Sequence, residues 1–112
     1  MKQSILYLTV TLLSMSSCQN GTLNKTSEIK VWGNCNMCKK TIEGSLDVNG
    51  VLEADWNKDT KMMSIGYDST LINLEQIEHL ISKSGYDTEM FRAEDNTYNN
   101  LHDCCKYERK EE

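Results

Sequence analysis

The order in which two kinds of apolar pattern follow one another limits the fold of this chain more than any other feature of its sequence. Residues that alternate between apolar and polar side chains indicate strands, and apolar residues spaced three or four apart indicate helices. Four segments have strand character: residues 27–33 (SEIKVWG), 51–56 (VLEADW), 62–68 (MMSIGYD) and 86–93 (YDTEMFRA). Two segments have helix character: residues 38–48 (CKKTIEGSLDV) and 73–85 (NLEQIEHLISKSG).

This order predicts an α+β fold. The β-α-β-β-α-β succession is that of the ferredoxin-like arrangement, in which a four-stranded antiparallel sheet carries two helices on one face. The polar stretch at residues 57–61 is short enough to join the second and third strands as a hairpin. Asn73 and Gln76 predict the start of the second helix, and Gly85 predicts its end. We therefore expect one small domain over residues 28–92.

Residues 1–17 are predicted to be an export signal rather than part of this domain. Lys2 precedes an apolar run at residues 5–13 that is too short to span a membrane, and small residues then lead to Cys18. This junction resembles a bacterial lipoprotein cleavage site, which implies a lipid on Cys18. We therefore expect an exported, membrane-anchored lipoprotein of the bacterial cell envelope that faces the periplasm, with residues 18–27 as a flexible tether. A plain cleaved signal and an uncleaved anchor are the alternatives.

The charge of the chain argues against a nucleic-acid partner. Its formal net charge at pH 7 is −5, and removal of Lys2 with the signal makes the rest more negative. Such a surface repels a phosphate backbone, and the sequence has no basic patch with interleaved aromatic residues. A membrane anchor and a protein partner remain compatible with this composition.

The cysteines carry the main chemical signal. Besides Cys18, the chain has Cys35 and Cys38 in a CxxC pair, and Cys104 and Cys105 side by side. Export permits disulfides, so a disulfide framework is the simplest alternative. However, a CxxC disulfide closes a very small ring and constrains the unfolded chain little. The pair is therefore better suited to chemistry than to stabilising the fold.

The predicted elements place Cys35 in a loop and Cys38 at the start of a helix. The free N–H groups and partial positive charge of a helix N-terminus favour thiolates, as do Lys39 and Lys40. Two thiolates on a short loop suit Cu(I) or Hg(II), whereas Zn(II) usually takes four ligands. Low coordination also leaves the metal accessible to an incoming thiolate, as a carrier requires.

Three stretches together resemble the heavy-metal-associated domain family: IKVWGNCNMCKKTIE, GVLEADWNKDTKMMSIGYD and LISKSGYDTEMF. The resemblance covers residues 29–91 and implies the ferredoxin-like fold, with Cys35 and Cys38 as metal ligands. It also implies a non-enzymatic metallochaperone or sequestering protein that passes its metal to a metal-transporting ATPase or efflux system. Cu(I) is the ion we expect, with Hg(II) and Zn(II) as alternatives. Tyr86, after Gly85, matches an aromatic residue that lies near the metal loop in many bacterial members.

The loop departs from the pattern of the family in one respect. Family members usually read Gly-Met-Thr-Cys-x-x-Cys, whereas this chain reads GNCNMC and lacks the methionine that anchors the loop in the core. Met37 either takes its place, points outward, or supplies a thioether as a third soft ligand.

The tail at residues 93–112 needs its own explanation. Cys104, Cys105 and His102 are additional candidate ligands, either in a second soft-metal site or folded back to the CxxC pair. A disulfide or inert thiols are the alternatives. A single zinc site with all four cysteines would be strained, because adjacent residues seldom direct both side chains at one ion. Three tail residues have helical spacing and predict a short helix packed on the domain: Tyr98, Leu101 and Cys105.

Two other functions compete with a copper carrier. A mercury-binding relay would use the same thiolates, so the sequence does not separate the two ions. A thiol–disulfide oxidoreductase also places CxxC at the start of a helix. Thioredoxin-like sites carry a cis-proline opposite the disulfide, and this chain contains no proline. No other catalytic constellation is visible, so we predict that the protein is not an enzyme.

Overall fold

The computed structural model describes residues 24–112, and the predicted export signal and Cys18 lie outside the described residues. The described sheet is antiparallel and has the strand order β1-β3-β2. Its strands are β1 (Asn24–Lys30), β2 (Val51–Trp56) and β3 (Met62–Asp68). β2 and β3 pair across a short turn, so the predicted hairpin is confirmed.

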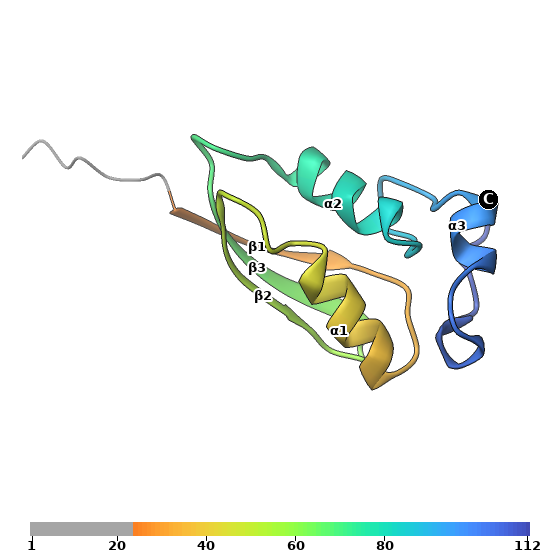
Figure 1. Cartoon of the computed structure of the whole chain (residues 1–112). Coiled ribbons are helices and arrows are strands. Elements are labelled where there is room, and N and C mark those ends of the chain that lie inside the picture. The colour runs from red at the N-terminus through yellow and green to blue at the C-terminus, as the bar shows by residue number, and fades with distance from the viewer. Residues whose placement is uncertain (1–23) are drawn as a thin grey trace, which may run out of the picture.

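The two longer helices cover the same face of the sheet (Figure 1). α1 (Asn36–Gly44) follows β1, and α2 (Leu74–Lys83) follows β3. The side chain of Asn73 accepts the N–H of Gln76, and the Gln76 side chain accepts the N–H of Asn73, so the predicted helix start is confirmed. Gly85 lies just beyond α2 with a φ of +108°, a conformation that favours glycine.

β1 begins earlier than the sequence predicts. Residues 24–26, which we expected to belong to the tether, pair with β3, and the ladder runs from Asn24 opposite Asp68 to Lys30 opposite Met62. These residues are exposed and polar, so the sequence shows no alternation of apolar and polar residues that would predict a strand here.

The prediction of a fourth strand at residues 86–93 is wrong. In the part of the chain that the structure describes, the sheet has three strands, and this segment contributes one isolated bridge, between Val31 and Thr88. The segment still lies beside the end of β1, because the N–H of Trp32 donates to the carbonyl of Asp87 at 2.9 Å. The path of the chain is therefore ferredoxin-like, although the fourth ladder does not form.

Side chains explain why that ladder is missing. A strand needs its backbone N–H groups for its neighbour, but here they bind elsewhere. The N–H of Asp87 donates to the Tyr107 hydroxyl, and the N–H of Met90 donates to the Glu78 carboxylate, both at 2.8 Å. The N–H of Ala93 donates to the side chain of Asp87 at 2.8 Å.

The tail folds back onto the domain. It contains α3 (Asp95–Asn99) and a 3₁₀ turn, η1 (Asp103–Cys105), and it lies at the end of the molecule where β1 connects to α1 (Figure 1). The predicted short helix is thus present, but it ends before Leu101 and Cys105. No helix within residues 24–112 has the length and apolar character needed to cross a bilayer.

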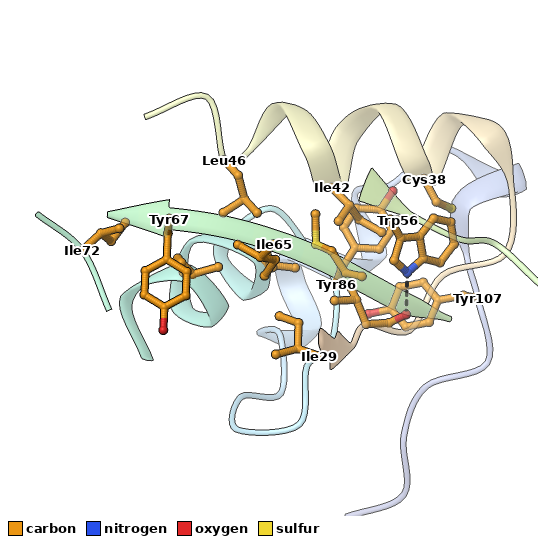
Figure 2. Close-up of a cluster of buried hydrophobic side chains, with 14 of the residues drawn as sticks. Ile29, Cys38, Ile42, Leu46, Trp56, Ile65, Tyr67, Ile72, Tyr86 and Tyr107 are labelled. Carbon is orange, nitrogen blue, oxygen red and sulfur yellow. Dashed lines mark hydrogen bonds between the residues drawn. The ribbon is translucent and has the colours of Figure 1, made fainter. Parts of the chain in front are cut away.

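Aromatic residues close the core at the same end. Figure 2 shows Trp56, Tyr86 and Tyr107 gathered there near Cys38. The indole N–H of Trp56 donates to the carbonyl of Val31 at 2.9 Å, and the Trp56 side chain is fully buried. The cysteine loop therefore packs against buried aromatic side chains.

Candidate metal site

The loop between β1 and α1 passes very close to the core. A Cβ atom added to Gly33 would lie 2.8 Å from Cη2 of Trp56 and 3.3 Å from Cβ of Cys38. Only glycine lets the backbone approach the indole this closely. The glycine thus brings the cysteine pair down onto the buried aromatic residues.

Cys35 is the N-cap of α1, which begins at Asn36 rather than at the predicted Cys38. The Sγ atom of Cys35 accepts the N–H of Cys38 at 3.4 Å, so the sulfur takes the place of the usual capping oxygen. The Sγ atoms of Cys35 and Cys38 are 3.2 Å apart, and the Cys38 thiol donates to Oδ1 of Asn34 at 3.1 Å. The predicted pair is therefore brought together at the start of the helix.

A third sulfur comes from the tail. Cys105 Sγ lies 3.9 Å from Cys35 Sγ, and the sulfurs of Cys35, Cys38 and Cys105 all lie within 4.8 Å of one another. Cys38 is fully buried, Cys105 is 2% exposed, and Cys35 is half-buried. None of the four described cysteines forms a disulfide. Three soft donors converge without an acidic or imidazole group in the cluster, which is a donor set for a soft ion.

The surroundings give the three thiols different acidities. Burial acts to raise the pKa of Cys35, but the hydrogen bond from the Cys38 N–H and the side-chain contacts with Cys38 and Cys105 outweigh it and lower the pKa. For Cys105, burial is the largest effect and raises the pKa to about 12. Cys35 is accordingly the thiol that ionises more readily, and its partly exposed position makes it the accessible sulfur of the cluster.

Tyr86 borders the cluster with a buried hydroxyl group. Its side chain is fully buried, and no hydrogen bond of standard geometry reaches the hydroxyl in the described part of the chain. Burial raises the pKa of Tyr86, and the neighbouring Cys38 and Cys105 raise it further. A neutral hydroxyl is thus held beside two sulfurs, as the position of Tyr86 after Gly85 led us to expect.

The other candidate ligands lie outside the three-sulfur cluster. Cys104 is exposed, and its thiol donates to Sδ of Met37 at 3.4 Å. Met37 is 48% exposed, so it does not replace the core methionine that the loop lacks. His102 is exposed at the N-cap of η1, and the described cluster does not include it. The Sγ atoms of the adjacent Cys104 and Cys105 lie 3.8 Å apart, but in the described part of the chain only Cys105 belongs to the three-sulfur cluster, so the four cysteines do not form one site.

Contacts on the C-terminal side of Cys105 fix its position. The Tyr107 hydroxyl donates to the carbonyl of Gly85 and accepts the N–H of Asp87, both at 2.8 Å. Arg109 then forms an ion pair with the fully buried carboxylate of Asp87 at 2.8 Å. The tail is therefore attached next to Tyr86, directly beside the cluster.

The sequence analysis did not separate Cys105 from Cys104, nor did it identify the roles of Tyr107 and Asp87. The sequence does contain a signal, because Cys105 and Tyr107 alternate with the charged residues Lys106 and Glu108, and the structure buries the first two and exposes the other two. This alternation indicates an extended segment with one face on the domain. We instead relied on the helical spacing of Tyr98, Leu101 and Cys105, which wrongly placed Cys105 in a helix that ends at Asn99.

Individual proteins of known function resemble the chain, although no family model matches it. The copper chaperone CopZ of Staphylococcus aureus is 33% identical over 54 residues, which are 47% of this chain and 79% of that protein. The solved structure of a CopZ metallochaperone has a TM-score of 0.55 and 30% identity, covering 57% of this chain and 98% of the other. A copper binding domain from HMA7, a P-type ATPase, has a TM-score of 0.55 and 26% identity, covering 57% of this chain and 89% of that domain.

Fold and clustered thiols together define a small domain that binds heavy-metal ions. The chain belongs to the heavy-metal-associated family that includes the copper chaperone CopZ. These relatives are carriers of metal rather than enzymes, so the prediction that this protein is not an enzyme is confirmed.

Proposed function

We propose that this protein binds Cu(I) through Cys35 and Cys38 and transfers it to a metal-transporting ATPase or efflux system. The observation that carries the proposal is the meeting of these two sulfurs, 3.2 Å apart, at the N-terminus of α1. Thiolates are the ligands that Cu(I) prefers, and a site with few ligands releases its ion by ligand exchange. The copper chaperones and the ATPase domain among the similar proteins support the choice of ion and of partner.

The proposal includes a location. We infer that the chain is exported and held at a membrane of the bacterial cell envelope by a lipid on Cys18, facing the periplasm. The support comes from the sequence alone: an apolar run after Lys2, followed by small residues and Cys18. Mass spectrometry of the protein extracted from bacterial membranes tests this part, because a lipidated Cys18 adds the mass of the acyl chains to a chain that starts at this residue.

Competition for Cu(I) tests the metal site. The reduced protein is titrated anaerobically against a chromophoric Cu(I) chelator, beside the Cys35→Ser/Cys38→Ser double variant. We expect the wild-type protein to withdraw Cu(I) from the chelator and the double variant to lose at least about two orders of magnitude in affinity, because both thiolate ligands are gone. The Cys104→Ser variant is the matched control, since its thiol lies outside the cluster, and it should bind as the wild type does.

Three results would overturn the proposal. If the wild-type protein does not compete for Cu(I) but takes up Hg(II) stoichiometrically, the site is a mercury relay. If neither ion binds and the CxxC pair cycles with small-molecule disulfides, the site is a redox pair. Equal Cu(I) affinity in the wild type and the double variant would exclude Cys35 and Cys38 as ligands.

A further inference from the structure

We propose that Cys105 is a third ligand, which completes a three-coordinate thiolate site with Cys35 and Cys38 and lets the tail retain the metal until an acceptor thiol displaces it. This inference rests on the proposed function, because it concerns the same site. It assigns the tail a role in holding and releasing the ion.

The distances between the sulfurs favour three ligands over two. A metal with thiolate bonds of about 2.3 Å sets three coplanar sulfurs about 4 Å apart and two opposed sulfurs about 4.6 Å apart. Cys35 Sγ and Cys105 Sγ are already 3.9 Å apart, and Cys35 Sγ and Cys38 Sγ are 3.2 Å apart. To bind a metal, the sulfurs of Cys35 and Cys38 must therefore move apart, and they need to move less for a trigonal site than for a linear one.

The site is built from buried groups rather than assembled at the surface. Cys38 and Tyr86 are fully buried, and Cys105 is 2% exposed. The Tyr86 hydroxyl has no hydrogen bond of standard geometry in the described part of the chain, although buried polar groups are nearly always paired. A thiolate accepts hydrogen bonds more strongly than a thiol does. Metal binding, which converts the thiols of Cys38 and Cys105 to thiolates, would supply this hydroxyl with an acceptor.

The position of Cys105 does not depend on a mobile chain end. Tyr107, two residues later, is 2% exposed and bound through its hydroxyl to Gly85 and Asp87. On the other side of Cys105, Leu101 packs on Gly85, where an added Cβ would lie 3.0 Å from its Cδ2 atom. Contacts on both sides thus hold the third sulfur over the CxxC pair.

Release would follow by exchange of one thiolate for another. The bond from Cu(I) to Cys105 breaks as the bond to the acceptor thiolate forms, and the proton that the acceptor thiol gives up passes to the Cys105 thiolate. No electron is transferred, and copper remains Cu(I).

X-ray absorption spectroscopy of the reduced, full-length protein loaded with one equivalent of Cu(I) tests the proposal directly. We expect three sulfur neighbours in the wild type and in Cys104→Ser, and two in Cys105→Ser. Loss of a partner outside the ligand shell costs metal affinity about 10–100-fold, so loss of Cys105 should lower Cu(I) affinity at least about tenfold and shorten the half-time of Cu(I) transfer to a chelator by a similar factor. Cys104→Ser should change neither quantity.

The outcomes separate the two proposals. Two sulfur neighbours in the wild type, or three that persist in Cys105→Ser, would overturn the role of Cys105 and leave the CxxC carrier intact. Absence of Cu(I) binding by the wild type would overturn the proposed function itself. The wild-type sulfur count does not depend on the folding of any variant, and circular dichroism of Cys105→Ser shows whether its lower affinity reflects a lost ligand or a lost fold.

Discussion

At the scale of single residues, the position of Gly33 decides how closely the metal loop approaches the core. The space beside this glycine is filled by Trp56, and the Cβ atom of Cys38 also lies within 3.3 Å of an added Cβ. Gly44, at the end of α1, has open space beside it, because no atom lies within 4 Å of an added Cβ. The two glycines therefore offer a matched pair of substitutions.

We expect Gly33→Ala to lower the free energy of unfolding by about 1–3 kcal/mol, the range for overpacking a filled core. Gly44→Ala should instead raise it by about 0.5–1 kcal/mol, because alanine stabilises a helix relative to glycine. Urea unfolding followed by circular dichroism measures both. Equal stability of Gly33→Ala and the wild type would show that the loop can lift away from Trp56.

At the scale of elements, the tail differs from the rest in what holds it. The sheet and the two longer helices pack through a common apolar core. The tail adds Cys105 and Tyr107 to this core and is also held by hydrogen bonds of the Tyr107 hydroxyl to Gly85 and Asp87. Within the tail, the Tyr98 hydroxyl donates to the carbonyl of Tyr107 at 2.6 Å. Loss of the Tyr107 hydroxyl is therefore expected to increase how often the tail leaves the cysteine loop.

Tyr107→Phe removes that hydroxyl and leaves the Asp87 N–H and the Gly85 carbonyl without their partner. We expect it to cost about 1–3 kcal/mol, the desolvation penalty of unpaired buried groups. Detachment of the tail should also speed the alkylation of Cys105, which mass spectrometry of peptides measures over time. Tyr67→Phe, at a buried tyrosine of β3, is the control and should leave the alkylation rate unchanged. An unchanged rate in Tyr107→Phe would mean that other contacts hold the tail.

The elements also show what the sequence can and cannot predict. The capping box of α2 and the β2–β3 hairpin depend on neighbouring residues, so local pattern was sufficient. The fourth strand failed because distant side chains, such as Glu78 and Tyr107, bind the backbone N–H groups that its ladder needed. The CxxC pair could be recognised as a candidate site for the same local reason, because its two cysteines are near neighbours in the sequence.

Cys105 could be assigned only from the fold. Its separation from Cys104 depends on how the tail returns to Gly85, a contact between segments far apart in the sequence. The alternation from Cys105 to Glu108 indicated which face is buried, but not what covers it.

At the scale of the whole molecule, a buried ion pair connects the tail to the domain and makes stability depend on pH. Burial acts to raise the pKa of Asp87, but the Arg109 guanidinium and the N–H groups of Ala93 and Lys110 outweigh it and lower the pKa. The folded protein therefore holds this proton less tightly than the unfolded chain does. The stabilisation is present above the unfolded pKa of about 4 and is lost as pH falls through the lower, folded value.

We expect the urea midpoint of unfolding to decrease between about pH 5 and about pH 3, where this carboxylate takes up its proton. Asp87→Asn should lower the free energy of unfolding at neutral pH by about 3 kcal/mol, because it leaves Arg109 without its buried partner, and should flatten the decrease in acid. Asp59→Asn, at an exposed turn position, is the control and should keep the wild-type pH profile. An equally steep profile in Asp87→Asn would assign the acid sensitivity to other groups.

The direction of β1 has a practical consequence for work with the protein. Asn24 opens the strand, and Lys30 ends it next to the metal loop, so the seven residues place about 20 Å between the entry of the chain into the domain and its thiols. A sample coupled to a sensor chip or a bead through its N-terminus therefore presents the cysteines on the side facing the solution. Immobilisation through the C-terminus would instead crowd the tail that lies over them (Figure 1).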